Sequence, residues 1–522
     1  MKTMQTVLLV ASLLLIGWSG PSRANTSQLS GLKGVLGERL LLNVSAETAG
    51  TYRYVSPIGY RNWNKAGLSQ TTEDETGLLR INLAPTLVFN DNAWPIFQFL
   101  VAGIELESRE YFEGTNFALR PLVAGDPALQ YRGQWDEPRV LQASFQALGK
   151  HWALKAGLVR SNWGVGLLSN DHRDSERTVF ESPFGASRYA DRNVRLQLAA
   201  FPWSRQQRGT NSYVPLTLAF AGDATVEDAH SDWLSGDRTY TAIGAAIFGF
   251  PGATTGLYIA HRLQDHANGG RTEVTAVDVM ADVGFRMGAT RLRLMGEAAI
   301  LLGETSYPQS VFVEGAHDVL SHGGVARIGI EHGIFEAVVE AGWASGDDNP
   351  YDSTVRSFSF NSGYRVGTLM FGEALRTGAA ASVINISDPE LRDNPPRALD
   401  RVSHRGVVRD AVYINPRLAL RPREDLHVWA GFLYGRSFGD YADPFWTSLA
   451  GGVAAGPNGA LRKQDLGYEI NLAIHHDHAF DPVTLNLRAE FAYFKPGRVF
   501  DSPAGERAPD VFGVHVNLGV RL

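Results

Sequence analysis

Arginines stand at alternate positions beside apolar residues in several separate segments of this chain. The set comprises Arg80, Arg195, Arg291, Arg293, Arg417, Arg421 and Arg488. Successive side chains of a strand point to opposite faces, so each of these arginines would lie on a polar face behind an apolar one. Guanidinium groups bind carboxylates and phosphates through a planar fork, and arginine rings are a selectivity device of anion pores. These residues are therefore candidates for contact with a polar or anionic solute.

Acidic residues occupy the same polar faces and leave a second interpretation open. They are Glu105, Glu107, Asp278, Asp282, Glu297, Glu336, Glu340, Glu469 and Glu490. Facing acids and arginines would form ion pairs that hold the structure in shape and contact no solute. Both interpretations fit the pattern.

Three short motifs suggest chemistry, and each has a simpler explanation. The turn "SGDDNPYD" brings together Asp347, Asp348 and Asp352, whose oxygens could hold calcium, but EF-hand spacing is absent and a solvated turn suffices. "GRSFG" matches G-x-S-x-G, yet it ends a strand rather than joining a strand to a helix. "HHDH" at 475–478 offers imidazoles, but adjacent strand residues point oppositely and the sequence shows no second ligand cluster. We expect no catalytic residue, no enzyme activity and no cofactor, and the acidic turn is only a minor metal candidate.

The elements that position these residues have a period of two. In "NVRLQLAA", Val194, Leu196 and Leu198 alternate with Arg195 and Gln197. Comparable segments run about 10 to 15 residues, longer than the mean globular strand, and strands that cross lipid at a tilt need about 9 to 11. Counting them gives roughly 18 strands, joined alternately by short turns and long polar loops. The pattern predicts an all-β fold, a single transmembrane antiparallel β-barrel.

The N-terminus predicts export. Lys2 precedes the short apolar run "VLLVASLLLIGW", and "PSRA" supplies small residues for cleavage. We assign residues 1–24 to a signal peptide and 25–522 to the barrel. The chain has no cysteine and a net charge of −7, which argues against a disulfide framework and against nucleic-acid binding. The alternating end "VFGVHVNLGVRL" is expected to be the strand that closes the barrel.

Several segments resemble one family. Four segments, in this order along the chain, resemble the C-terminal half of alginate-export-type outer-membrane barrels: "ASGDDNPYDS", "SFSFNSGYRVGTLMFGE", "DLGYEINLAIHHD" and "LRAEFAYFKPG". An earlier segment, "GLVRSNWGVGLLSND", is similar to a Trp-Gly-x-Gly segment in related barrels of that group. The matching positions are Asp347, Asp348, Gly467, Glu469, Pro496 and Gly497. The resemblance implies a barrel of about 18 strands whose arginine-lined interior conducts an anionic polysaccharide. None of the matching residues is an arginine, and Leu522 replaces the terminal aromatic residue of many such barrels.

The hypothesis is a passive channel in the outer membrane of a Gram-negative bacterium. It would pass polar solutes, anionic ones included, or an exopolysaccharide. The alternative is an attachment barrel that holds capsule or exopolysaccharide on its external loops and does not conduct. The expected partners are outer-membrane lipid, the barrel-assembly machinery and a small polar solute or anionic polysaccharide, with no nucleic acid. The solute, the openness of the interior, the oligomeric state and the exact number of strands stay open.

Overall fold

The computed structural model describes most of the chain after its first segment. The described residues are 40–61, 63, 67–71, 74–89, 96–111, 139–170, 180, 182–184, 191–203, 215–228, 230–267, 269–307, 315–349, 352–386, 406–480 and 483–521. The predicted signal peptide, residues 1–24, lies outside them. So does the side chain of Arg80, although its backbone belongs to a strand.

Eighteen long strands of the described chain form one antiparallel sheet. Their bounds are β1 (Leu40–Val55), β4 (Asp74–Phe89), β5 (Ile96–Tyr111), β6 (Arg139–Leu148), β7 (Trp152–Val159), β8 (Arg192–Ala200), β9 (Leu216–Glu227), β10 (Arg238–Phe250), β11 (Ala253–Asp265), β12 (Arg271–Met287), β13 (Thr290–Thr305), β14 (His317–His332), β15 (Phe335–Ala344), β17 (Ala411–Arg423), β18 (Leu426–Ser437), β19 (Asp465–Phe480), β20 (Val483–Pro496) and β21 (Val511–Arg521). The prediction of an all-β barrel of about 18 strands is confirmed.

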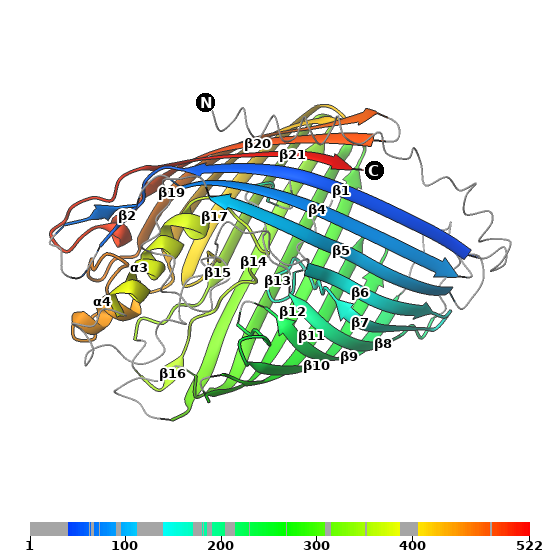
Figure 1. Cartoon of the computed structure of the whole chain (residues 1–522), viewed down its shortest axis with the longest axis horizontal. Coiled ribbons are helices and arrows are strands. Elements are labelled where there is room, and N and C mark those ends of the chain that lie inside the picture. The colour runs from blue at the N-terminus through cyan, green and yellow to red at the C-terminus, as the bar shows by residue number, and fades with distance from the viewer. Residues whose placement is uncertain are drawn as a thin grey trace.

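The sheet closes on itself through its first and last strands. Strand β1 pairs with β4 on one side and with β21 on the other, where Tyr52 faces Val516. Strand β21 also pairs with β20, so both of its edges are occupied. In Figure 1, β1 and β21 run side by side along the barrel. The segment predicted to close the barrel therefore does so, which leaves no open edge along this seam.

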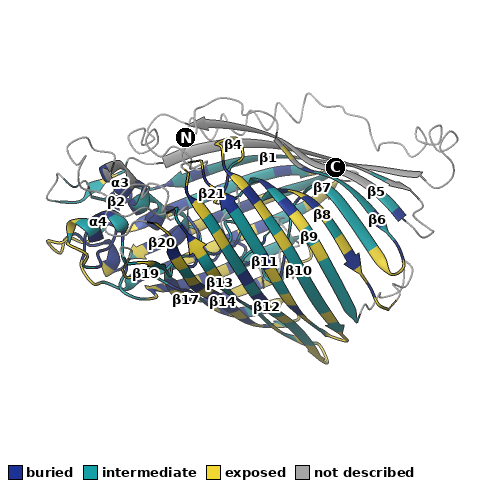
Figure 2. Ribbon diagram, turned by 90° about the horizontal axis from the view of Figure 1, so that it is seen from below, coloured by how far each residue is buried: buried dark blue, intermediate teal, exposed yellow. Residues whose placement is uncertain are grey.

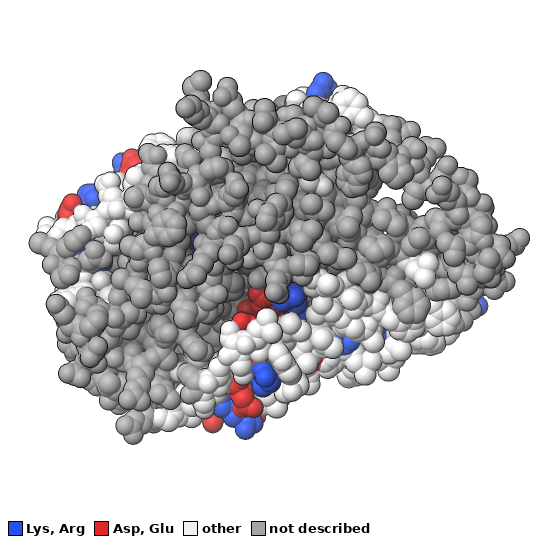
Figure 3. All heavy atoms as spheres, viewed as in Figure 1, with Lys and Arg blue, Asp and Glu red and all other residues white. Residues whose placement is uncertain are grey.

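The strands expose apolar residues outward and turn polar residues inward. On β8, Val194, Leu196 and Leu198 are 49%, 62% and 52% exposed, whereas Arg195 between them is 8% exposed. Figure 2 shows this alternation as bands along the strands, and in Figure 3 most of the described wall facing the viewer is uncharged. Exposing so much apolar surface to water would cost a soluble protein free energy, whereas a barrel in lipid requires an apolar outer face.

The two ends of the barrel differ. Two-residue turns at 251–252, 288–289, 333–334 and 424–425 join strands at one end. Gly252, Gly288 and Gly333 have positive φ in these turns, which glycine adopts without strain. At the other end lie the helices α3 (Arg376–Ile386) and α4 (Pro444–Leu449) and the short strand β2 (Gly59–Tyr60) (Figure 1). Barrels of this kind place their short turns in the periplasm and their long loops outside the cell.

Smaller elements belong to the long loops. They are β3 (Ser69–Gln70), which pairs with β2; β16 (Thr354–Val355), which lies parallel to β14; the π-helix η2 (Met370–Leu375); and the 3-10 helix η5 (Arg498–Phe500). None of the described helices is long and apolar enough to cross a membrane. The largest buried apolar cluster joins loop residues such as Phe358, Phe360 and Leu369 to wall residues such as Tyr413 and Phe494. The loops are therefore packed against the inner surface of the wall.

Candidate functional site in the barrel interior

The loop between β7 and β8 enters the barrel. We call its described residues, 160–170, 180 and 182–184, inner loop 1. The Trp163 indole N–H donates to Asp278 Oδ1 on the inner face of β12, at 2.8 Å. A Cβ atom added to Gly256 of β11 would come within 2.7 Å of the Trp163 ring, so the glycine permits this close approach.

A buried glutamate of the wall fixes inner loop 1 by its backbone. Glu297 on β13 is 3% exposed and accepts the N–H groups of Val165, Gly166 and Leu167, the last two at 3.0 and 3.1 Å. Gly166 has φ +93°, a conformation that allows three successive amides to converge on one carboxylate. Such convergence is the geometry by which backbone amides bind anions, and here the anion is part of the protein.

Two phenylalanines of inner loop 1 reach the opposite wall. Phe180 and Phe184 are each 1% exposed and pack with Trp429 of β18. The Phe180 carbonyl accepts a hydrogen bond from Arg417 at 3.2 Å. A Cβ atom on Gly431 would come within 2.5 Å of the Phe184 ring, so this wall position also requires glycine. Inner loop 1 thus spans from β12 and β13 to β17 and β18.

The loop between β15 and β17 enters the barrel in the same manner. We call residues 352–386 inner loop 2. Glu469 of β19, which has no exposed surface, accepts the N–H groups of Thr368 at 2.6 Å, Leu369 at 3.1 Å and Met370 at 2.7 Å. These amides stand at the start of η2, where backbone N–H groups lack partners within the helix. Glu469 is therefore the counterpart of Glu297, and each holds one inner loop.

A third buried glutamate joins inner loop 2 to three strands. Glu340 of β15 accepts hydrogen bonds from Arg327 of β14 at 2.8 Å and from Arg417 of β17 at 2.9 Å. The hydroxyl groups of Tyr364 and Tyr413 donate to its other oxygen at 2.8 and 2.7 Å. Two guanidinium groups and two hydroxyls thus compensate one buried carboxylate, as a charge removed from water requires.

The arginines predicted from sequence lie on the inner face, and each one described contacts an acid. The pairs are Arg195 with Asp223, Arg291 with Glu331, Arg293 with Asp282, Arg417 with Glu340, Arg421 with Glu336 and Arg488 with Glu490. Arg195 and Asp223 face each other across β8 and β9 and share two hydrogen bonds of 2.6 Å. The interior therefore carries the ion pairs of the second interpretation, and Arg80 lies outside the described side chains.

Access to solvent separates these arginines. The side chain of Arg417 has no exposed surface, so in this structure it holds Glu340 and inner loop 1 and contacts no open space. The side chains of Arg291, Arg421 and Arg293 are 50%, 35% and 25% exposed. These three lie near the short-turn end of their strands.

The acidic turn at 347–352 has a cation of its own. Arg356 donates to Asp352 at 2.7 Å and lies 3.8 Å from Asp347. Asp347 also accepts the backbone N–H of Arg356 at 3.1 Å. Burial raises the pKa of the Asp347 carboxyl, and this hydrogen bond opposes the shift. Asp348 is exposed. The guanidinium group thus stands where the sequence suggested calcium.

Sequence reasoning missed a basic cluster on inner loop 2. Glu373 of η2 contacts both Arg53 of β1 and Arg376 of α3. Arg365 lies beside them, and its NH1 reaches the carbonyl of Gly406 at 3.4 Å. Burial lowers the pKa of Arg365 to about 10; the charge of Glu373 opposes this shift, and those of Arg376 and Arg53 add to it. Arg365 and Arg376 lie on a loop, where no strand pattern marks them, so alternation could not reveal them.

Comparison with known proteins reveals a likeness in structure alone. No protein-family model matches the sequence, and no curated protein is similar to it. Among solved structures, OccK5 (OpdH) of Pseudomonas aeruginosa is similar with a TM-score of 0.50 and 10% identity, covering 92% of this chain and 98% of that one. OccK2 (OpdF) of the same organism has a TM-score of 0.47 and 11% identity, over 92% and 97% of the two chains.

The likeness to OccK5 shows the fold. The chain has the architecture of an outer-membrane β-barrel porin, and the predicted location in a Gram-negative outer membrane agrees with it. The resemblance to alginate-export-type barrels is not confirmed, because the neighbour that shows the fold is the porin OccK5 (OpdH).

Proposed function

We propose that the protein is a passive outer-membrane channel for small polar solutes. The observation that carries the proposal is the closed barrel whose outer face is apolar and whose inner face holds arginines, acids and two inner loops. A wall of this kind satisfies its backbone in lipid and presents polar groups to what passes inside. The porin architecture of OccK5 supports the same function by analogy of fold.

The inner loops favour small solutes over a polymer. Glu297 and Glu469 each hold a loop inside the barrel through three backbone amides. The loops fill interior space at two places on the wall, and an exopolysaccharide chain would need both moved. We therefore place alginate-like polysaccharides behind small sugars and organic acids as candidate solutes.

Arg365 supports a preference for anions. It lies on inner loop 2, is partly exposed, and its NH1 donates to the backbone carbonyl of Gly406. An anionic solute would supply the charged partner, since a guanidinium group binds carboxylates through two parallel hydrogen bonds. We propose Arg365 as the solute-contacting arginine, ahead of the fully buried Arg417.

Planar-bilayer recording tests the function. The purified protein should form channels that conduct, with a reversal potential displaced toward anions in a salt gradient. Arg365→Ala should move this potential toward cations, and Arg365→Lys should largely retain the wild-type value because it keeps the charge. Arg291→Ala is the matched control, since this arginine is half exposed and already paired with Glu331.

Two results would count against the proposal. Absence of any conductance from correctly folded protein would favour the attachment barrel, whose filled interior would then serve only to hold the external loops. Conductance with an ion preference identical in wild type and Arg365→Ala would leave the channel standing and remove Arg365 from it.

A further inference from the structure

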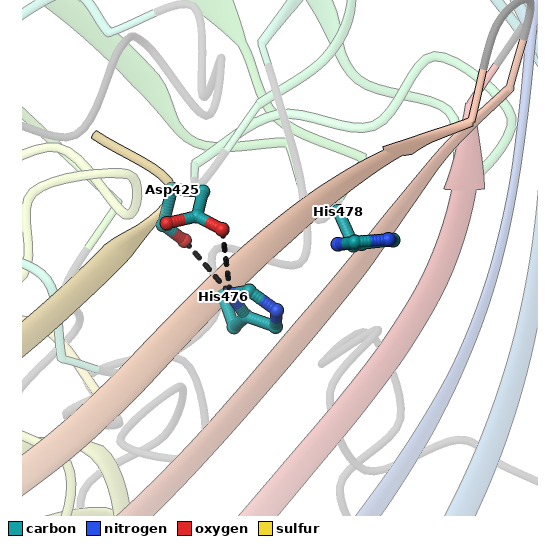
Figure 4. Close-up of side chains that lie close together, drawn as sticks. All are labelled: Asp425, His476 and His478. Atoms are coloured by element: carbon teal, nitrogen blue, oxygen red, sulfur yellow. Dashed lines mark hydrogen bonds and ion pairs between the residues drawn. The ribbon is translucent and has the colours of Figure 1, made fainter. Parts of the chain in front are cut away.

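Two histidines and one aspartate meet at the short-turn end of the barrel, away from the interior. Asp425 belongs to the turn between β17 and β18, and His476 and His478 belong to β19. One ligand atom of each residue lies within 4.8 Å of the corresponding atoms of the other two. Figure 4 shows the three side chains grouped beside the strand end.

The strand geometry explains why they meet. Residues two apart on a strand share a face, so His476 and His478 both point outward, beyond the exposed Ile474 and on the side opposite the inward His475. Leu426 pairs with His476 across β18 and β19, which places the preceding residue, Asp425, beside the histidines. The Asp477 N–H donates to the Asp425 carbonyl at 2.9 Å and fixes the turn against β19.

Neighbouring groups orient the first histidine and the carboxylate. His476 Nδ1 lies 3.0 Å from the Asp425 carbonyl oxygen. A carbonyl only accepts, so this nitrogen carries the proton, and Nε2 keeps its lone pair. Arg423 Nε lies 3.1 Å from Oδ1 of Asp425, and Oδ2 lies 3.7 Å from His476 Nδ1, so the carboxylate stands beside the imidazole. A hydrogen bond from the second imidazole nitrogen to a carbonyl is the usual support of a metal-binding histidine.

We propose that Asp425, His476 and His478 bind a divalent late first-row transition-metal cation, of which Zn²⁺ is the reference. Two imidazoles and one carboxylate are suitable ligands for such a cation, and water would complete the coordination. Bonds of about 2.0–2.1 Å place tetrahedral ligands about 3.3 Å apart. His478 is exposed, so rotation of its side chain brings the ring nitrogen inward from the separation in this structure.

The location defines what the site would do. Short turns face the periplasm in barrels of this kind, so the cation would come from the periplasm and lie at the outer rim of the wall. It would join the β17–β18 turn to β19 at the point where the pairing between β18 and β19 ends. The positive charge of Arg423 opposes a cation, which sets the affinity below that of a closed structural zinc site.

Zinc titration of the full mature protein in detergent, purified without a polyhistidine tag, tests the site. A competing chromophoric chelator should report one saturable Zn²⁺ equivalent per chain. His476→Ala and His478→Ala should each weaken binding by at least about 10-fold, as loss of one of three ligands requires. His332→Ala is the control, because His332 is an exposed histidine at the same end, on β14.

A second measurement keeps the proposal open to refutation if a variant folds poorly. Co²⁺ added to wild-type protein should produce visible absorption bands of a low-symmetry site, and equimolar Zn²⁺ should remove them. Wild-type protein without saturable Zn²⁺ binding, or without these bands, would overturn the proposal. So would affinities in His476→Ala and His478→Ala, migrating as folded barrels, that match the affinity of His332→Ala.

Discussion

Removal of the Glu469 carboxylate should release inner loop 2 while the barrel stays closed. Glu469 accepts three backbone N–H groups, at 2.6, 3.1 and 2.7 Å, and has no exposed surface. Hydrogen bonds to a charged group contribute roughly 1.5–3 kcal/mol each. Because the three share one carboxylate and are not additive, we take a total slightly below the sum of three lower values, about 4 kcal/mol.

Glu469→Ala and Glu469→Gln should increase the released fraction of inner loop 2 by different amounts. Glu469→Ala leaves three buried amides without an acceptor, so the loss of about 4 kcal/mol should raise the released fraction of the loop about 1000-fold. Glu469→Gln keeps one acceptor oxygen but loses the charge, which accounts for about half of the strength. It should raise the released fraction about 30-fold, equivalent to about 2 kcal/mol.

Native-state proteolysis measures this fraction directly. Trypsin cleaves after Arg365 and Arg376 only when inner loop 2 leaves the wall, and the cleavage rate follows the open population when closing is fast. Glu304→Gln, which changes an exposed acid on β13, is the control. Heat-modifiable migration on gels should show every variant as a folded barrel. Cleavage of Glu469→Ala at the wild-type rate would refute the view that this carboxylate holds the loop.

Three further outcomes follow from the geometry. Arg417→Ala should destabilise the barrel by about 3–5 kcal/mol, because it leaves Glu340 buried with less compensation, whereas Arg291→Ala, at the partly exposed pair with Glu331, should cost under about 1 kcal/mol; urea unfolding in detergent compares the two. Burial raises the pKa of Asp443, at the start of α4, to about 7, so the folded state keeps a proton that the unfolded state loses above pH about 4. The stability of α4 should therefore fall by up to roughly 4 kcal/mol as the pH rises from about 4 to about 7. Hydrogen exchange of α4 should show this pH dependence in wild type but not in Asp443→Asn, which retains the cap. Deletion of β21 should abolish assembly, because β1 and β20 would face lipid unpaired, and accumulation of folded truncated protein would exclude that role.

The alternation of apolar and polar residues predicts which side chains of the strands face outward and which face inward. It placed Leu196 outside and Arg195 inside because a strand has a period of two, whatever its partners. Pairings between arginines and acids were harder to predict. Arg195 meets Asp223 only through the register of β8 with β9, and this register depends on loop lengths and on bulges that a single sequence does not show.

The contacts between the inner loops and the wall could not be predicted from the sequence for a different reason. Glu297 and Glu469 bind backbone amides 130–132 and 99–101 residues away, and a backbone amide has no side-chain signature. The sequence marked both glutamates as acids of the polar strand faces, and Glu469 also as part of a motif. Arg417 was a candidate either for solute contact or for an ion pair, and one of its hydrogen bonds is to the carbonyl of Phe180, 237 residues earlier in the chain.

Anchoring by main chain rather than by side chains has an evolutionary consequence. Any residue except proline offers an N–H at 165–167 or 368–370, so the hydrogen bonds to the wall do not themselves specify the side chains, apart from Gly166 with its φ of +93°. The side chains of the inner loops can therefore change while the hydrogen bonds that hold the loops to the wall are kept. Among descendants of this barrel, the two wall glutamates should persist while loop side chains drift, and a loop grafted from one to another should seat correctly if its length and glycines are kept.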